Sequence, residues 1–211
     1  MKATALAIML TLFFAIPSGA LPDLIFADDF EGGDPLNWSS VVGYQAPVCV
    51  AEGTGIYEGD NIADFSLSNC SGTSVSLHSR CSVAKGVLVV HVAGWDPAGT
   101  ALIGSILSGM ADELSQGLDL MVVLGEDPAG QTPSFAYCAV FAAANSLSDN
   151  QIFIDGGWSL TRANIYAYPT SGTDFMIPWT GLLDGDNMLY VYGEGEGSGN
   201  LGSAVAQVMA D

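Results

Sequence analysis

The chain has 211 residues, and its 23 acidic residues against four lysines and arginines give a formal net charge of −19 at pH 7. Such a surface repels nucleic acid and anionic membranes, because no basic patch is present to neutralise phosphates. Nearly half of the residues are hydrophobic (49%), and apolar runs alternate with Gly-rich turns, which argues against disorder despite the charge. The charge favours solubility outside the cell, with cation binding as a narrower alternative.

The first twenty residues have the features of a secretory signal peptide. Lys2 supplies a minimal basic start, Leu6 to Ile16 form an apolar run, and Ser18-Gly19-Ala20 is a small-residue cleavage site. The apolar run is too short for a membrane span, and no later stretch approaches that length. We therefore expect cleavage after Ala20, export to the periplasm or the extracellular space, and no membrane span in the mature chain.

Residues 21–57 read as an acidic N-terminal extension. Part of this segment resembles a short motif that often follows the signal peptide in secreted bacterial proteins, carried by Phe26, Asp28, Phe30, Glu31, Gly33, Asp34 and Trp38. The resemblance implies export rather than an activity. The carboxylates in this motif are ligands of the type that calcium prefers, but their spacing matches no calcium loop, and a solvated linker is the simpler explanation.

From residue 58 the apolar pattern becomes regular. A β-hairpin is predicted around Cys70-Ser71-Gly72, where apolar residues alternate with polar ones on both sides. The β-branched run of residues 85–94 is typical of a strand buried on both faces. A helix follows it, with Asp96 as N-cap and Pro97 as the first helical residue.

The remaining elements alternate between strands and helices. We expect strands over 118–124 and 152–155, helices over 132–144 and 159–166, a hairpin of strands 179–183 and 188–192, and a last helix over 201–209. The run Asp184-Gly185-Asp186-Asn187 has calcium-like residues, although a hairpin turn explains it with less. This order predicts an α/β sandwich with a mixed sheet.

Four cysteines lie in the exported part, and an even number in an oxidising compartment indicates structural disulfides. Cys70 and Cys81 flank the Gly72 turn, so the pair Cys70–Cys81 is favoured and Cys49–Cys138 follows by default. No C-x-x-C occurs, and the two histidines, His78 and His91, are not clustered with cysteines, so we expect no metal and no cofactor. His91 is expected to pack within its strand, and His78 to be exposed.

Four fragments in this order resemble the thioredoxin fold in its secreted redoxin variety, the alkyl hydroperoxide reductase and thiol-specific antioxidant type. They are Ala63-Asp64-Phe65-Ser66-Leu67, Gly72 to Leu77, Val87 to Trp95, and Ile177-Pro178-Trp179 with Leu182-Leu183-Asp184. The resemblance implies a three-layer sandwich over 58–211, with a central mixed sheet, flanking helices and an N-terminal β-hairpin. It also implies a cis bond before Pro178, facing the redox site.

The departure from the redoxin pattern lies at that site. Where the family has W-C-x-x-C, this chain has Trp95-Asp96-Pro97-Ala98-Gly99, so Asp96 stands at the nucleophilic cysteine and Gly99 at the resolving one. A helix N-terminus that stabilises a thiolate can equally bind the carboxylate of a cap. A carboxylate forms no mixed disulfide, so dithiol exchange at this turn is excluded.

The sequence therefore favours a non-catalytic binding or structural module. A candidate groove near Pro178 would hold an extended peptide or a small ligand, although ordinary packing is the simpler explanation of its residues. These residues are Trp95, Asp96, Pro97, Ile177, Pro178 and Trp179. The alternative is a thiol oxidoreductase or peroxidase using Cys138 or another cysteine, although nothing near a mid-helix cysteine activates it. A calcium-dependent surface protein is a third, weaker hypothesis.

Overall fold

The computed structural model describes residues 49–167, 175–194 and 200–210. The expected signal peptide and the acidic motif of residues 26–38 lie outside these ranges. The described residues belong to one compact unit that starts at Gln45. None of the helices within these ranges is long and apolar enough to cross a bilayer.

Seven strands form a single sheet in the order β2-β1-β5-β4-β3-β6-β7. The strands are β1 (Ser66–Asn69), β2 (Ser74–Ser76), β3 (Gly86–Ala93), β4 (Leu118–Glu126), β5 (Ile152–Ile154), β6 (Trp179–Asp184) and β7 (Tyr190–Gly193). The helices are η1 (Leu77–Arg80), α1 (Pro97–Gly109), α2 (Ala111–Ser115), α3 (Phe135–Ala144), η2 (Gly156–Trp158), α4 (Ser159–Asn164) and α5 (Leu201–Ala210). The sheet is mixed, because β3, β4 and β5 are parallel while the other pairs are antiparallel.

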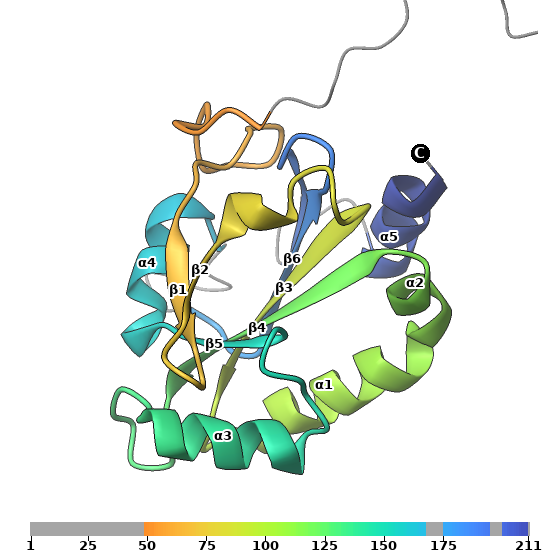
Figure 1. Ribbon diagram of the computed structural model, residues 1–211. Coiled ribbons are helices and arrows are strands. Elements are labelled where there is room, and N and C mark those ends of the chain that lie inside the picture. The colour runs from red at the N-terminus through yellow and green to blue at the C-terminus, as the bar shows by residue number, and fades with distance from the viewer. Residues whose placement is uncertain (1–48, 168–174, 195–199, 211) are drawn as a thin grey trace, which may run out of the picture. The chain divides into compact units, whose positions relative to one another are not determined.

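Helices cover both faces of this sheet (Figure 1). The central strand β3 is buried along its whole length, and alternate side chains enter two separate cores. Leu88, Val90 and Val92 pack with α1, α3 and α5, whereas Val87 and Val89 pack with η2 and the residues after α4. The expected three-layer α/β sandwich with its N-terminal hairpin is therefore confirmed.

Local chemistry explains where the elements begin. The β-branched run forms β3, and α1 starts at the expected Asp96 cap with Pro97 as its first residue. The helix expected from residue 132 begins instead at Phe135, because the Ser134 hydroxyl accepts the Tyr137 N–H at 3.2 Å and caps it there. The strand expected from residue 188 begins at Tyr190, because Met188 has a left-handed backbone (φ 58°) that interrupts the extended chain.

The expected disulfide pairing is wrong. Cys49 bonds to Cys81 and Cys70 bonds to Cys138, with Cα–Cα distances of 6.3 and 5.2 Å. Cys70 lies in the core beneath α1, α3 and α5, together with Cys138. Cys49 and Cys81 pack against the core on the opposite face. The sheet therefore separates Cys70 from Cys81, and nearness in sequence gives no contact between them.

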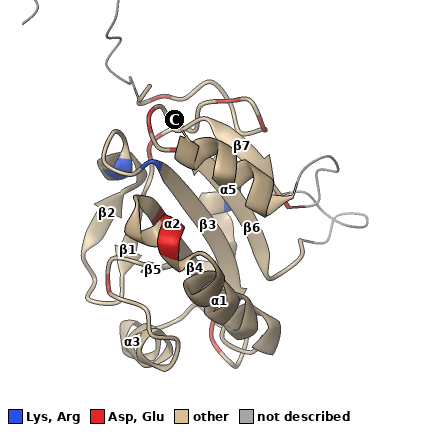
Figure 2. Cartoon of the chain, turned by 90° about the vertical axis from the view of Figure 1, so that its right-hand side faces the viewer, with Lys and Arg blue, Asp and Glu red and all other residues tan. Residues whose placement is uncertain are grey.

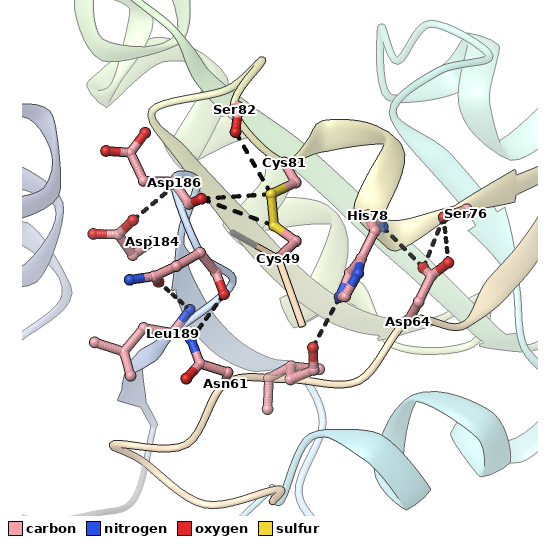
Figure 3. Close-up of a disulfide and its surroundings, with 12 residues drawn as sticks. Cys49, Asn61, Asp64, Ser76, His78, Cys81, Ser82, Asp184, Asp186 and Leu189 are labelled. Carbon is pink, nitrogen blue, oxygen red and sulfur yellow. Dashed lines mark hydrogen bonds between the residues drawn. A yellow bond between two sulfur atoms is a disulfide. The ribbon is translucent and has the colours of Figure 1, made fainter. Parts of the chain in front are cut away.

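The segment of residues 49–61, named here the strap, is hydrogen-bonded to β7, and its Cys49 and Asn61 lie beside the β6–β7 turn (Figure 3). The Asn61 amide donates to the Asn187 carbonyl at 2.8 Å. The Gly59 N–H donates to the Tyr190 carbonyl and the Tyr190 N–H donates to the Asp60 carbonyl, both at 2.8 Å. Part of an otherwise open sheet edge is thereby covered. Next to it, His78 is half-buried, whereas it was expected to be exposed. Its Nε2 lies 2.9 Å from the Ile62 carbonyl.

Candidate functional site

The candidate site lies where β3 leads into α1. The neighbouring parallel strand β4 ends at the same edge of the sheet, because Ala93 pairs with Glu126 and the Gly94 N–H donates to the Glu126 carbonyl at 2.7 Å. The indole Nε1–H of Trp95 donates to Glu126 Oε2 at 2.7 Å, and the Trp95 side chain remains 49% exposed. The strand ends thus hold an aromatic ring at the surface.

Asp96 is the N-cap of α1. Its Oδ1 accepts the Ala98 N–H and its Oδ2 accepts the Gly99 N–H, both at 3.0 Å. These backbone amides are the donors that a helix N-terminus offers to an anion. Because the carboxylate occupies both of them, its role as a helix cap is confirmed.

The Gly99 position, where the redoxin pattern has its resolving cysteine, is closely packed. A Cβ placed on Gly99 would lie 3.0 Å from Val92 Cγ1 and 3.1 Å from Val92 Cβ. These distances are shorter than ordinary van der Waals contact, so a side chain at this position requires Val92 to shift. The turn is therefore packed for a glycine.

The Ile177–Pro178 bond is cis, as the resemblance implied. Trp179 pairs with His91 in the antiparallel β3–β6 ladder, so the chain before it runs toward the sheet edge that carries the Asp96 turn. Ile177 and Pro178 are half-buried and Met176 is 42% exposed, whereas Trp179 is only 1% exposed. Of the candidate groove residues, Trp179 therefore belongs to the core and offers no surface to a ligand.

His91 packs within its strand as expected, but in an unusual setting. Its ring lies 4.8 Å from the Trp179 ring, 5.3 Å from that of Phe175 and 6.5 Å from that of Trp158. Within the described residues neither ring nitrogen has a hydrogen-bond partner. Burial, and then the charge of Arg162, lower the pKa of His91 to about 3, so the imidazole is neutral near pH 7. The sequence does not reveal this cluster, because its rings come from three distant segments.

No thiol is present at the site. All four cysteines of the chain are in disulfides, and Cys138 is fully buried. Among the described residues no group of three or more His, Cys, Asp or Glu side chains could hold a metal ion. The calcium-like run forms the expected hairpin turn, in which Asp184 Oδ1 accepts the Asp186 N–H and Asn187 Oδ1 accepts the Leu189 N–H, each at 2.8 Å.

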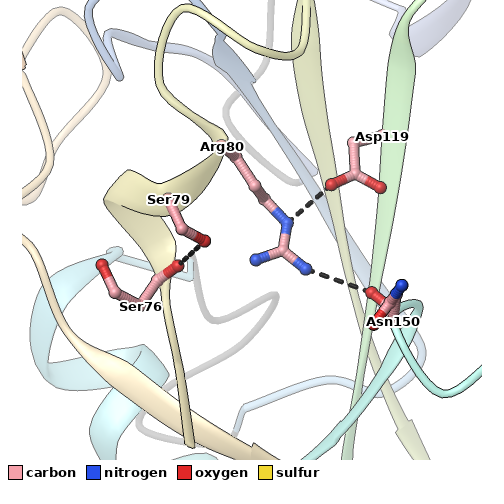
Figure 4. A network of polar contacts seen from close by, with 5 residues as sticks. All are labelled: Ser76, Ser79, Arg80, Asp119 and Asn150. Carbon is pink, nitrogen blue, oxygen red and sulfur yellow. Dashed lines mark hydrogen bonds and ion pairs between the residues drawn. The ribbon is translucent and has the colours of Figure 1, made fainter.

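A cavity of about 400 Å³ lies elsewhere, beside the start of β4. Its polar wall is a network around Arg80, whose Nε is 2.6 Å from Asp119 Oδ2 and whose Nη2 donates to the Asn150 carbonyl at 3.1 Å (Figure 4). The guanidinium also lies 5.0 Å from the centre of the Phe153 ring. Arg80 thus links η1 to the start of β4, whereas Glu126 lies at the other end of that strand. The sequence contained no signal for this network.

The comparisons with known proteins agree on the fold. No family model and no curated protein sequence matches the chain. Similar solved structures include a protein of Sinorhizobium meliloti described as hypothetical (18% identity, TM-score 0.55, covering 76% of this chain and 88% of that one). A protein of Bacteroides thetaiotaomicron assigned as a protein disulfide isomerase has 15% identity and a TM-score of 0.53, over 75% and 92% of the two chains.

Peroxidoxin BcpB of Mycobacterium tuberculosis is also similar, with 18% identity and a TM-score of 0.50, over 74% of this chain and 97% of the other. At these identities the likeness establishes the fold alone. The chain has the thioredoxin-like fold that the sequence fragments implied.

Proposed function

We propose that this protein is an exported binding module of thioredoxin-like fold that works without a dithiol centre. The observation that carries the proposal is the turn after β3, where the Asp96 carboxylate binds the Ala98 and Gly99 amides at 3.0 Å. In the redoxin pattern those amides stabilise a cysteine thiolate. A carboxylate in that place has no route to a mixed disulfide.

The state of the other cysteines supports the same proposal. Both disulfides join elements that are distant in sequence, with separations of 32 and 68 residues, as structural disulfides commonly do. Disulfides of this kind persist in oxidising compartments. They therefore agree with export by the proposed signal peptide of residues 1–20, to the periplasm or the extracellular space.

The binding surface that we propose is the edge between the Asp96 turn and the Ile177–Pro178 segment. Trp95 and Met176 are 49% and 42% exposed on its two sides, and exposed apolar side chains of this size mark interaction sites when they are grouped. Ile177 and Pro178 complete the edge and are half-buried. An extended peptide lying along this edge would cover the apolar side chains.

The alternative is a thiol oxidoreductase or peroxidase, the activities that the names of two structural neighbours suggest. It requires reduction of a disulfide, and Cys138 is the cysteine that sequence reasoning singled out. Cys138, expected in mid-helix, is instead the fourth residue of α3. Its side chain is fully buried, so a substrate has no direct access to its sulfur. These facts favour the binding module.

Activity assays separate the two functions. The native protein should contain no free thiol, and it should neither reduce insulin nor consume peroxide at a rate above background. Turnover that disappears in Cys138→Ser would contradict the proposal and establish the thiol enzyme. A Ser105→Ala variant, altered on the exposed face of α1, controls for general effects of substitution.

A further inference from the structure

Trp95 is hydrogen-bonded to a carboxylate and therefore combines an exposed aromatic ring with a nearby negative charge. Its Nε1–H donates to Glu126 Oε2 at 2.7 Å, which fixes the plane of the indole while leaving the side chain 49% exposed. Glu126 is half-buried at the end of β4. A fixed indole face beside a carboxylate is a recognition element for a cation, since tryptophan is the best aromatic partner in cation–π contacts.

We propose that this site selects peptides that carry a lysine or arginine, with the cationic side chain lying over Trp95 and paired with Glu126. The inference rests on the proposed peptide-binding function and names the class of peptide. The flanking peptide residues would be apolar and extended, covering Met176 and the Ile177–Pro178 segment on the other side of the edge.

The charges around the turn support a cationic occupant. Asp127 follows Glu126, and together with burial its carboxylate raises the pKa of Tyr137, burial being the larger cause. The Tyr137 hydroxyl in turn donates to the Gly94 carbonyl at 3.4 Å. Two carboxylates, those of Glu126 and Asp127, therefore lie at the end of β4 beside the turn that carries Trp95.

No basic side chain of the described residues forms an ion pair with these carboxylates. The one ion pair found there is Arg80–Asp119, so neither Glu126 nor Asp127 has an internal cationic partner. Arg80 and Lys85 precede β3, and α1 follows the other end of that strand. Figure 2 shows blue segments beside the start of β3, away from α1. Arg162 stacks on Phe175 at 4.4 Å, on the face of the sheet that bears α4. A cationic group on a ligand could therefore pair with these carboxylates without competing with a basic side chain of the protein.

The test uses three capped pentapeptides of the form Ala-Val-X-Val-Ala, in which X is Lys, Gln or Glu. Calorimetry with the purified protein at low ionic strength should show the Lys peptide binding about threefold to tenfold more tightly than the Gln peptide, the size expected for a partly exposed charge pair with a cation–π contact. The Glu peptide should bind more weakly than both. Added salt should reduce the difference between them.

Glu126→Gln should abolish the preference for Lys while leaving binding of the Gln peptide within about twofold, because the Gln side-chain oxygen can still accept the Trp95 N–H. Glu113→Gln is the matched control, since Glu113 is also half-buried and lies on α2, and it should retain the preference. If all three peptides bind equally, or if Glu113→Gln and Glu126→Gln behave alike, the inference is overturned and the proposed function stands. If none of the peptides binds, the peptide-binding function falls, and the inference with it.

Discussion

Asp96 shows how the amides at the start of a helix can bind a carboxylate. The thiolate position of the redoxin pattern and the N-cap of an ordinary helix need the same backbone amides, and here a carboxylate binds two of them. Sequence reasoning identified this cap because Asp-Pro before an apolar helical pattern is a local signal. Its energetic role can be tested directly.

Asp96→Ala should lower the free energy of unfolding by about 1 kcal/mol, because two helix amides lose their acceptor. Asp96→Asn should lose less, since the amide oxygen still caps. Urea unfolding monitored by circular dichroism measures both. If Asp96→Ala abolished peptide binding at unchanged stability, Asp96 would contact the ligand and would not be mainly a cap.

His91 should make the protein sensitive to acid. Its pKa is lowered to about 3 in the folded state, against about 6.5 in an unfolded chain, so the unfolded state binds the proton first as pH falls. Neutral His91 therefore contributes a few kcal/mol to the free energy of unfolding. This contribution is present in full above about pH 6.5 and is lost as the pH falls toward 3.

Replacement of the imidazole by a ring that does not titrate tests this dependence. His91→Phe should show a smaller loss of unfolding free energy between pH 7 and pH 4 than the unaltered protein, as measured by urea titrations at each pH. His78→Phe serves as a comparison for the other histidine. If the unfolding free energy of His91→Phe depended on pH in the same way as that of the unaltered protein, the pKa of His91 would not be lowered by folding.

At the scale of elements, the strand–turn–helix unit of β3 and α1 is the part of the fold in which every local signal agrees. The β-branched run, the Asp cap and Pro97 all predict the observed element, and agreement of this kind is what makes a local sequence readable. The packing of Val92 against Gly99 is different, because it depends on how α1 lies on the sheet.

Introducing two thiols into this unit should therefore succeed only partly. Asp96→Cys with Gly99→Cys is expected to gain dithiol activity in insulin reduction, but at a cost in stability from the contact with Val92. Adding Val92→Ala should raise the activity by making room for the second side chain. If the triple variant had no activity, the turn would not have the geometry of a redox centre.

At the scale of the molecule, the two disulfides tie peripheral segments to opposite faces of the sheet. Cys49–Cys81 holds the strap, and Cys70–Cys138 joins the β1–β2 hairpin to α3. Each closes a long loop of the unfolded chain, with sequence separations of 32 and 68 residues, and the chain-entropy model assigns each about 4 kcal/mol.

Removing either disulfide should lower stability without impairing peptide binding. The pair Cys70→Ala with Cys138→Ala, and separately Cys49→Ala with Cys81→Ala, should each lose about 2–5 kcal/mol of unfolding free energy. Thermal unfolding and the peptide titration above measure the two properties. Loss of binding in a variant that remains folded would show that a disulfide shapes the site.

The sequence alone determined the succession of strands and helices along the chain, the burial of β3 and the cap of α1. Periodicity and capping act between residues that are close in the chain, which is why these features could be predicted. It also indicated the thioredoxin-like fold and the cis bond before Pro178. The disulfide partners, the ring cluster around His91 and the Trp95–Glu126 contact were decided only by the tertiary structure. Each joins residues from segments distant in sequence, and which of them meet depends on the face and edge of the sheet to which the fold brings them.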